Sequence, residues 1–208
     1  MLSEDRKIKT RAQLKETLAI ECARYPLSLR RIVPYLLQIS EGAILRRHTV
    51  LLRKTEYYRN TGRCVLATLY EARLMRLQNR HALHIPLNTC GKGLQIFHLF
   101  PVCMNGNVTV GEYCRILPNV SVIGDDTAAD LAPTVGDHVT LGIGCTLLGG
   151  ITIADGVTVG AGAVVTKSFL EPGITVAGVP AKKISDHSRA ARSVNASDRG
   201  AAPGSKSL

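Results

Sequence analysis

One histidine, His98, stands where a side chain could move a proton. It closes the stretch Gly93-Leu94-Gln95-Ile96-Phe97-His98. An imidazole with an unperturbed pKa of about 6.5 accepts a proton at neutral pH, so His98 is a candidate general base. A lone histidine in a β-strand is more often structural, and the residue type alone leaves both interpretations open.

A run of small residues near the end of the chain could line a narrow ligand. Gly160, Ala161 and Gly162 leave backbone amides accessible, and Lys167 and Lys182 could supply point charges for phosphate groups. Tight turns also require small residues, and lysines are often merely solvated. The residue types alone therefore do not distinguish a ligand-binding surface from a tight turn.

The element that positions these residues repeats every six residues. Apolar side chains at that spacing occur without a slip at Val135, Leu141, Leu147, Ile153, Val159 and Val165. Neither a helical period nor simple alternation gives this pattern. Three such hexads make one triangular coil whose inward residues stack on the next coil, and earlier rungs at Cys90, Ile96 and Val102 bring the total to about four coils.

The hexads are interrupted between Gly124 and Thr134, which predicts a loop that leaves the coil. Such loops often carry function. Its acidic residues Asp125, Asp126 and Asp130, together with Asn105, are candidate contacts to a polar substrate.

Three regions follow from these patterns. Residues 1–84 show apolar residues at helical spacing and predict an α-helical region. Residues 85–184 predict a β-helix, and residues 185–208 predict a disordered tail without apolar periodicity. The fold class is therefore mainly β: a parallel β-helix of hexapeptide repeats behind an N-terminal α-helical region.

The formal charge of +10 lies in the first region. Residues 1–84 hold 17 Lys and Arg against 7 Asp and Glu, whereas residues 85–208 hold 9 of each. A solvated helix surface explains this excess, and so does an approach to phosphate groups. We expect no nucleic-acid partner, and peripheral association of the basic region with a membrane stays open.

The remaining composition excludes several classes. No apolar run is long enough to cross a bilayer, and the first residues are charged, which predicts a cytoplasmic protein. Six cysteines are scattered without a CxxC pair, so we expect neither disulfides nor a metal site. A metal-dependent hydratase would also need a histidine cluster, and none has the required spacing.

Two groups of motifs resemble a known family. Residues 93–98, Asn105 and Val110-Gly111-Glu112-Tyr113-Cys114 are similar to the acceptor-site coil of serine acetyltransferases and of their relatives in surface-polysaccharide synthesis. Leu141-Gly142-Ile143-Gly144, residues 160–167 and Val176-Ala177-Gly178-Val179-Pro180-Ala181-Lys182 resemble the acetyl-CoA half of hexapeptide-repeat acetyltransferases.

The resemblance implies a left-handed β-helix, a homotrimer and acetyl-CoA bound in grooves between neighbouring β-helices. It implies His98 as the base that takes the proton of an acceptor hydroxyl. The implied cofactor-binding residues are Gly142, Ile143, Gly160, Ala161, Thr166, Lys167 and Lys182.

The departures from the family pattern concern the acceptor. Cysteine-biosynthetic serine acetyltransferases have an aspartate before the catalytic histidine and a second histidine before the proline after the loop; here these positions hold Phe97 and Ala132. The aspartate that orients the base falls at about Leu83. We therefore expect a sugar acceptor in a surface-polysaccharide precursor, free or linked to a lipid or nucleotide. L-serine is the alternative acceptor, and a non-enzymatic trimeric scaffold is the second alternative.

Overall fold

The computed structural model describes residues 2–26, 40–124 and 131–188, and the predicted tail from residue 189 onward lies outside them. Within these described residues, three helices precede the strands: α1 (Arg11–Cys22), α3 (Glu41–Asn60) and α4 (Cys64–His81). Thr10 begins α1 with a capping box that involves Gln13, and Ser40 accepts a hydrogen bond from the backbone N–H of Ala43 at the start of α3.

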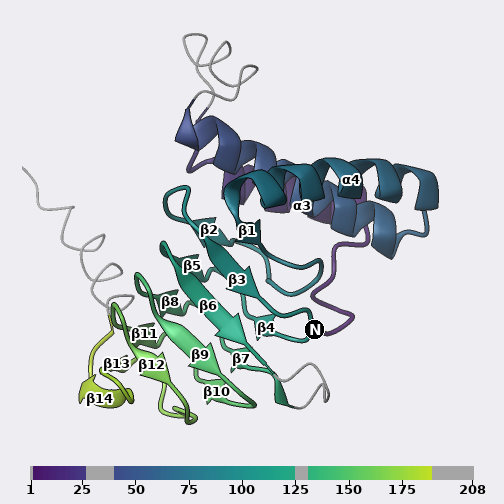
Figure 1. The fold of residues 1–208 in the computed structure, drawn as a ribbon. Helices are drawn as coiled ribbons and strands as arrows, with labels where there is room; N and C mark the ends of the chain where they lie inside the picture. The colour runs from purple at the N-terminus through teal and green to yellow at the C-terminus, as the bar shows by residue number, and fades with distance from the viewer. Residues whose placement is uncertain (1, 27–39, 125–130, 189–208) are drawn as a thin grey trace, which may run out of the picture.

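After α4 the chain winds into a three-sided prism of parallel strands, a left-handed β-helix (Figure 1). Sheet A contains β1 (Leu83–His84), β3 (Val102–Met104), β6 (Val120–Ile123), β9 (Thr146–Leu148) and β12 (Val164–Val165). Sheet B contains β4 (Thr109–Val110), β7 (Thr134–Val135) and β10 (Thr152–Ile153). Sheet C contains β2 (Gln95–Ile96), β5 (Arg115–Ile116), β8 (Thr140–Leu141), β11 (Thr158–Val159), β13 (Thr175–Ala177) and the antiparallel β14 (Lys182–Ser185).

The predicted inward residues form the core of the prism. Leu141 pairs in register with Ile116 on one side and Val159 on the other, and all three are fully buried. Burial of each such side chain contributes about 1.5–3 kcal/mol, which makes the stack the main stabilising element of the coil. The sequence predicted about four coils, and β1 and β13 add rungs at the two ends.

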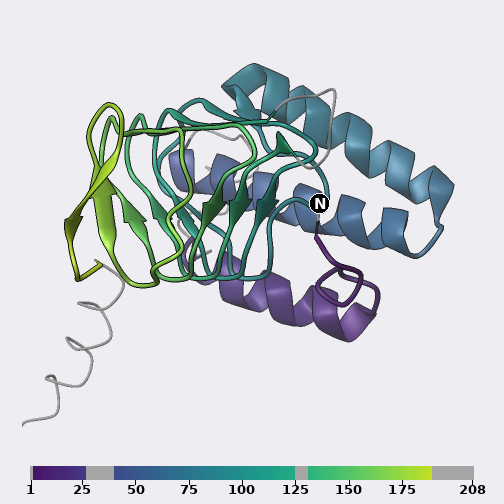
Figure 2. The same cartoon turned by 90° about the horizontal axis from the view of Figure 1, so that it is seen from below.

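The helices lie at the N-terminal end of the prism, with α3 between α1 and α4 (Figures 1 and 2). Arg53 of α3 attaches them to the first coil. Its fully buried guanidinium binds the carboxylates of Glu21 and Glu56 and donates to the backbone carbonyls of Cys90 and Gly91 at 2.9 and 2.7 Å. Because the opposite charges are buried together, this network fixes how α3 sits on the coil.

Within the described residues, no helix is long and apolar enough to cross a membrane. The six cysteines are free, and this part of the chain contains no cluster of ligands that could hold a metal ion.

Candidate functional site

One corner of the prism carries the residues of greatest chemical interest. At this corner, called the C–A edge below, the chain turns from sheet C into sheet A in each coil. His98, Asn119, Gly144 and Gly162 occupy the turns after β2, β5, β8 and β11, with φ of 67°, 60°, 68° and 65°. All four have the same left-handed backbone conformation, so His98 belongs to the same row of turns as the predicted ligand wall.

The His98 side chain extends from the first of these turns. It is 66% exposed, and its Nδ1 lies 3.2 Å from Oε1 of Glu41. The same carboxylate oxygen accepts a hydrogen bond from the backbone N–H of Leu99 at 2.5 Å. A carboxylate at Nδ1 favours the tautomer that carries its proton there, which leaves Nε2 as the nitrogen able to accept a proton.

The His98 turn opens into a cleft of about 320 Å³ between the prism and the helices. Arg24 covers the neighbouring residue, since its guanidinium carbon lies 3.5 Å from the centre of the Phe97 ring. The hydroxyl of Tyr25 donates to the carbonyl of Ile96, and burial raises the pKa of Tyr25 to about 12, so this hydroxyl keeps its proton at neutral pH. Arg46 holds the segment in place by donating to the Tyr25 carbonyl at 3.0 Å.

Glu41, Arg24 and Tyr25 were not among the residues selected from the sequence. They belong to the helical region, 57 or more positions before His98. The position expected from the family to orient the histidine, Leu83, is fully buried in the core. His84 is exposed on β1 and pairs with Cys103 of β3, the strand of sheet A that follows the His98 turn.

The predicted cofactor residues of the middle coils lie on the C–A edge. A Cβ at Gly142 would stand 2.5 Å from the carbonyl oxygen of Val159, and one at Gly160 would stand 2.8 Å from Cβ of Ala177. Only glycine permits such close stacking of coils. Ile143 is half exposed and Ala161 is exposed beside these glycines, so this part of the edge presents apolar side chains and no charged group.

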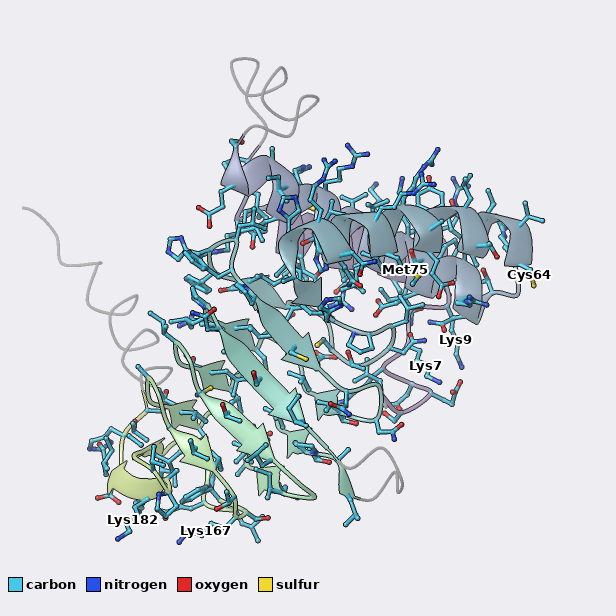
Figure 3. The ribbon with its side chains drawn as sticks, viewed as in Figure 1. Lys7, Lys9, Cys64, Met75, Lys167 and Lys182 are labelled. Atoms are coloured by element: carbon cyan, nitrogen blue, oxygen red, sulfur yellow. The ribbon has the colours of Figure 1, made fainter. Side chains whose placement is uncertain are left out.

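The remaining predicted cofactor residues lie near the C-terminal end of the prism. Thr166 and Lys167 follow β12, at the end of that strand away from the C–A edge, and Lys182 begins β14. Figure 3 shows both lysines at this end of the molecule. Neither forms an ion pair within the described residues, whereas the neighbouring Lys183 is bound by Glu171 and Asp186. Two cationic groups are thus left for an anion.

The predicted acceptor contacts are placed in part. Asn105 follows β3, at the end of that strand away from His98, and its N–H donates to the carbonyl of Val122 at 3.2 Å. Asp125, Asp126 and Asp130 lie outside the described residues. Gly124 and Ala132, described residues on either side of this segment, lie close together, because a Cβ at Gly124 would stand 2.7 Å from Cα of Ala132. A single chain therefore does not bring Asn105 to the His98 turn.

Comparisons with known proteins agree with this architecture. The family model for bacterial transferase hexapeptide (six repeats) matches residues 132–167. No curated protein matches the chain in sequence.

Solved structures match over most of the chain. Serine acetyltransferase of Neisseria gonorrhoeae in complex with serine is 24% identical, with a TM-score of 0.60 over 84% of this chain and 70% of that one. Soybean serine acetyltransferase apoenzyme is 26% identical, with a TM-score of 0.59 over 82% and 69%. A serine acetyltransferase in complex with CoA is 20% identical, with a TM-score of 0.59 over 84% and 71%. The chain has a serine acetyltransferase-like fold with a hexapeptide-repeat transferase segment.

Proposed function

We propose that this protein is an acetyl-CoA-dependent O-acetyltransferase whose acceptor is a hydroxyl of a sugar in a surface-polysaccharide precursor. One observation carries the proposal: the His98–Glu41 pair stands on the same edge as the closely stacked turns that contain Gly142 and Gly160. His98 and Gly162 are three coils apart, about 14 Å at the usual spacing of neighbouring strands. An extended thioester arm along this edge would present its acetyl group to the histidine.

The chemistry follows from that arrangement. The acceptor hydroxyl gives its proton to Nε2 of His98 while its oxygen attacks the thioester carbonyl carbon. The bond from carbon to sulfur then breaks, and the leaving thiolate takes up the proton from the His98 imidazolium, which restores the free base. Glu41 at Nδ1 stabilises the imidazolium that forms in between. The acetyl group passes directly to the acceptor, so no covalent enzyme intermediate is needed.

Binding of acetyl-CoA is supported by the solved relative in complex with CoA and by Lys167 and Lys182, which form no ion pair within the described residues. At a hundredfold excess over its dissociation constant, acetyl-CoA should stabilise the fold by about 2.7 kcal/mol, measured as a thermal shift. Ala161→Phe should abolish the shift by blocking the wall, and Ala12→Phe on exposed α1 should retain it. A thermal shift and calorimetry that detect no binding by the unmutated protein would refute the cofactor assignment and favour the scaffold.

The residues around His98 favour a sugar acceptor over free serine. Free serine needs groups for its ammonium and carboxylate, and the positions that provide them in the family hold Phe97 and the buried Ala132. Arg24 covers Phe97, and Arg24 and Tyr25 line the cleft beside His98. The guanidinium of Arg24 could pair with the phosphate of a sugar that is linked to a lipid or nucleotide.

L-serine remains the second candidate, because the solved structure from Neisseria gonorrhoeae is a serine acetyltransferase in complex with serine. Release of free thiol from acetyl-CoA separates the two acceptors. We expect turnover with a nucleotide-linked or lipid-linked sugar to exceed turnover with serine. Efficient turnover of serine at millimolar concentration, or rescue of a strain that requires cysteine, would assign the protein to cysteine biosynthesis instead.

The proposal includes a homotrimer. Asn105 lies across sheet A from the C–A edge, so it could contribute to a site at that edge only on a neighbouring chain. A three-fold assembly would supply that neighbour. Measurement of the molar mass in solution tests this, and a stable monomer with full activity would contradict it.

A further inference from the structure

The outer face of the α3–α4 pair carries a group of arginines that the proposed acetyl transfer does not use. A hollow of about 470 Å³ is lined by Arg47 of α3 and by Arg73, Arg76, Leu77 and Arg80 of α4. The three α4 arginines are three and four positions apart, so they lie on one side of the helix. None of the four arginines forms an ion pair within the part of the chain that the structure describes.

The positive charge continues along the groove between the two helices. Lys54 of α3 lies over the ring of Tyr70 at 5.4 Å, and Arg73 lies 5.9 Å from the same ring. The nearby Glu71 is already bound to Arg59. The groove therefore holds several cations without matching carboxylates, which favours an anionic partner.

The same ridge of α4 becomes apolar toward its N-terminal end, which Cys64 marks in Figure 3. Leu66 and Leu69 precede Arg73 at the same helical spacing, and they are 37% and 46% exposed. Val65 beside them is 84% exposed. Exposed leucines and uncompensated arginines thus share one ridge, formed by Leu66, Leu69, Arg73, Arg76 and Arg80.

We propose that this α4 ridge docks on an anionic membrane surface. Arginines bind lipid phosphates, and leucines beside them can enter the boundary between headgroups and acyl chains. A nucleic-acid backbone would satisfy the arginines and leave the leucines in water. A second copy of the chain would offer the arginines no carboxylate from its own ridge, because the five ridge residues include no acidic side chain.

Docking would also place the His98 cleft close to lipid. Helix α3 begins at Glu41 beside His98 and reaches Arg47 about 9 Å further along its axis. A lipid-linked acceptor would then lie near the base. This last step rests on the proposed function, whereas the docking itself does not.

Flotation of the full-length protein with phosphatidylcholine vesicles, with and without phosphatidylglycerol, tests the docking without any acetyltransferase assay. We expect binding only with phosphatidylglycerol, and weaker binding as salt is added. Arg76→Gln/Arg80→Gln should weaken binding about 25-fold, from about fivefold for each arginine. Leu66→Gln/Leu69→Gln should also weaken it at unchanged charge, and Arg47→Gln on α3 provides a second test should an α4 variant misfold.

The matched control is Arg11→Gln/Lys15→Gln, which removes the same charge from exposed positions on α1 and should bind like the unmutated protein. Equal losses for the two double-charge variants, or equal binding to vesicles without phosphatidylglycerol, would overturn the proposal. Binding of an oligonucleotide that is tighter than binding to the phosphatidylglycerol vesicles, and that depends on the arginines but not on the leucines, would assign the ridge to nucleic acid. A lower molar mass of the leucine variant would assign it to contact between copies.

Discussion

Replacement of Glu41 by glutamine should lower the turnover number by no more than about fivefold. The amide oxygen of glutamine can still accept hydrogen bonds from Nδ1–H of His98 and from the N–H of Leu99. The substitution therefore removes the negative charge and keeps the geometry. Because the two side chains are 66% and 46% exposed, water screens their attraction. Such exposed pairs contribute about 0.2–1 kcal/mol, and 1 kcal/mol corresponds to about fivefold in rate.

Replacement of Glu41 by alanine should have the larger effect. It removes both hydrogen bonds, each of which contributes about 1 kcal/mol, and it releases the turn that holds His98 in a left-handed conformation. Turnover should fall by some tens of fold, while acetyl-CoA affinity stays the same. The assay is thiol release from acetyl-CoA with the sugar acceptor, beside an acetyl-CoA titration of each variant.

Two results would refute this reasoning. A loss of a hundredfold or more for Glu41→Gln would mean that the charge acts in a dry site, unlike the exposed pair described above. Unchanged turnover for Glu41→Ala would mean that the carboxylate does not orient the histidine during the reaction.

Three further predictions concern the fold. Burial lowers the pKa of His48 to about 4, so protonation of His48 favours the unfolded chain. The free energy of unfolding should therefore fall by about 3 kcal/mol between pH 6.5 and 4. Thermal unfolding of His48→Leu should show a much smaller loss over that range. Arg53→Gln leaves two buried carboxylates without their cation and should lower the free energy of unfolding by about 3–5 kcal/mol, measured by urea denaturation. A loss below about 1 kcal/mol would contradict the role of Arg53 in attaching α3 to the first coil. Gly142→Ala should lower the free energy of unfolding by about 1–3 kcal/mol, because the new Cβ would clash with a backbone carbonyl. Gly106→Ala, whose Cβ has no neighbour within 4 Å, should be nearly neutral. Equal thermal stabilities of the two variants would contradict the close stacking of the coils.

The prism was predictable because its determinants are local and repeated. A residue such as Leu141 is buried by the residues one coil before and after it, so six-residue spacing alone predicts the stack. The same spacing puts Gly142 and Gly160 one coil apart on one edge, and the structure shows that the turn that carries His98 lies on that edge too. The family resemblance supplied the chemistry that such an edge supports.

Glu41 was not predictable in this way, since it reaches His98 only because α3 docks on the first coil. That docking depends on the buried network around Arg53, whose partners Glu21 and Cys90 are far apart in sequence. The six-residue repeat does not predict such contacts between the helices and the coil. Asn105 shows the converse: it is seven residues from His98 in sequence, yet β3 separates the two.

The central claim is that His98 takes the acceptor proton, and the turnover number of His98→Asn tests it most directly. Asparagine keeps a polar side chain but cannot accept a proton at neutral pH. We predict a turnover number lower by about a hundredfold to ten-thousandfold, with acetyl-CoA affinity measured on the same preparation unchanged. A folded His98→Asn protein that binds acetyl-CoA and turns over at a near-normal rate would show that the base lies elsewhere, with His84 as the next candidate.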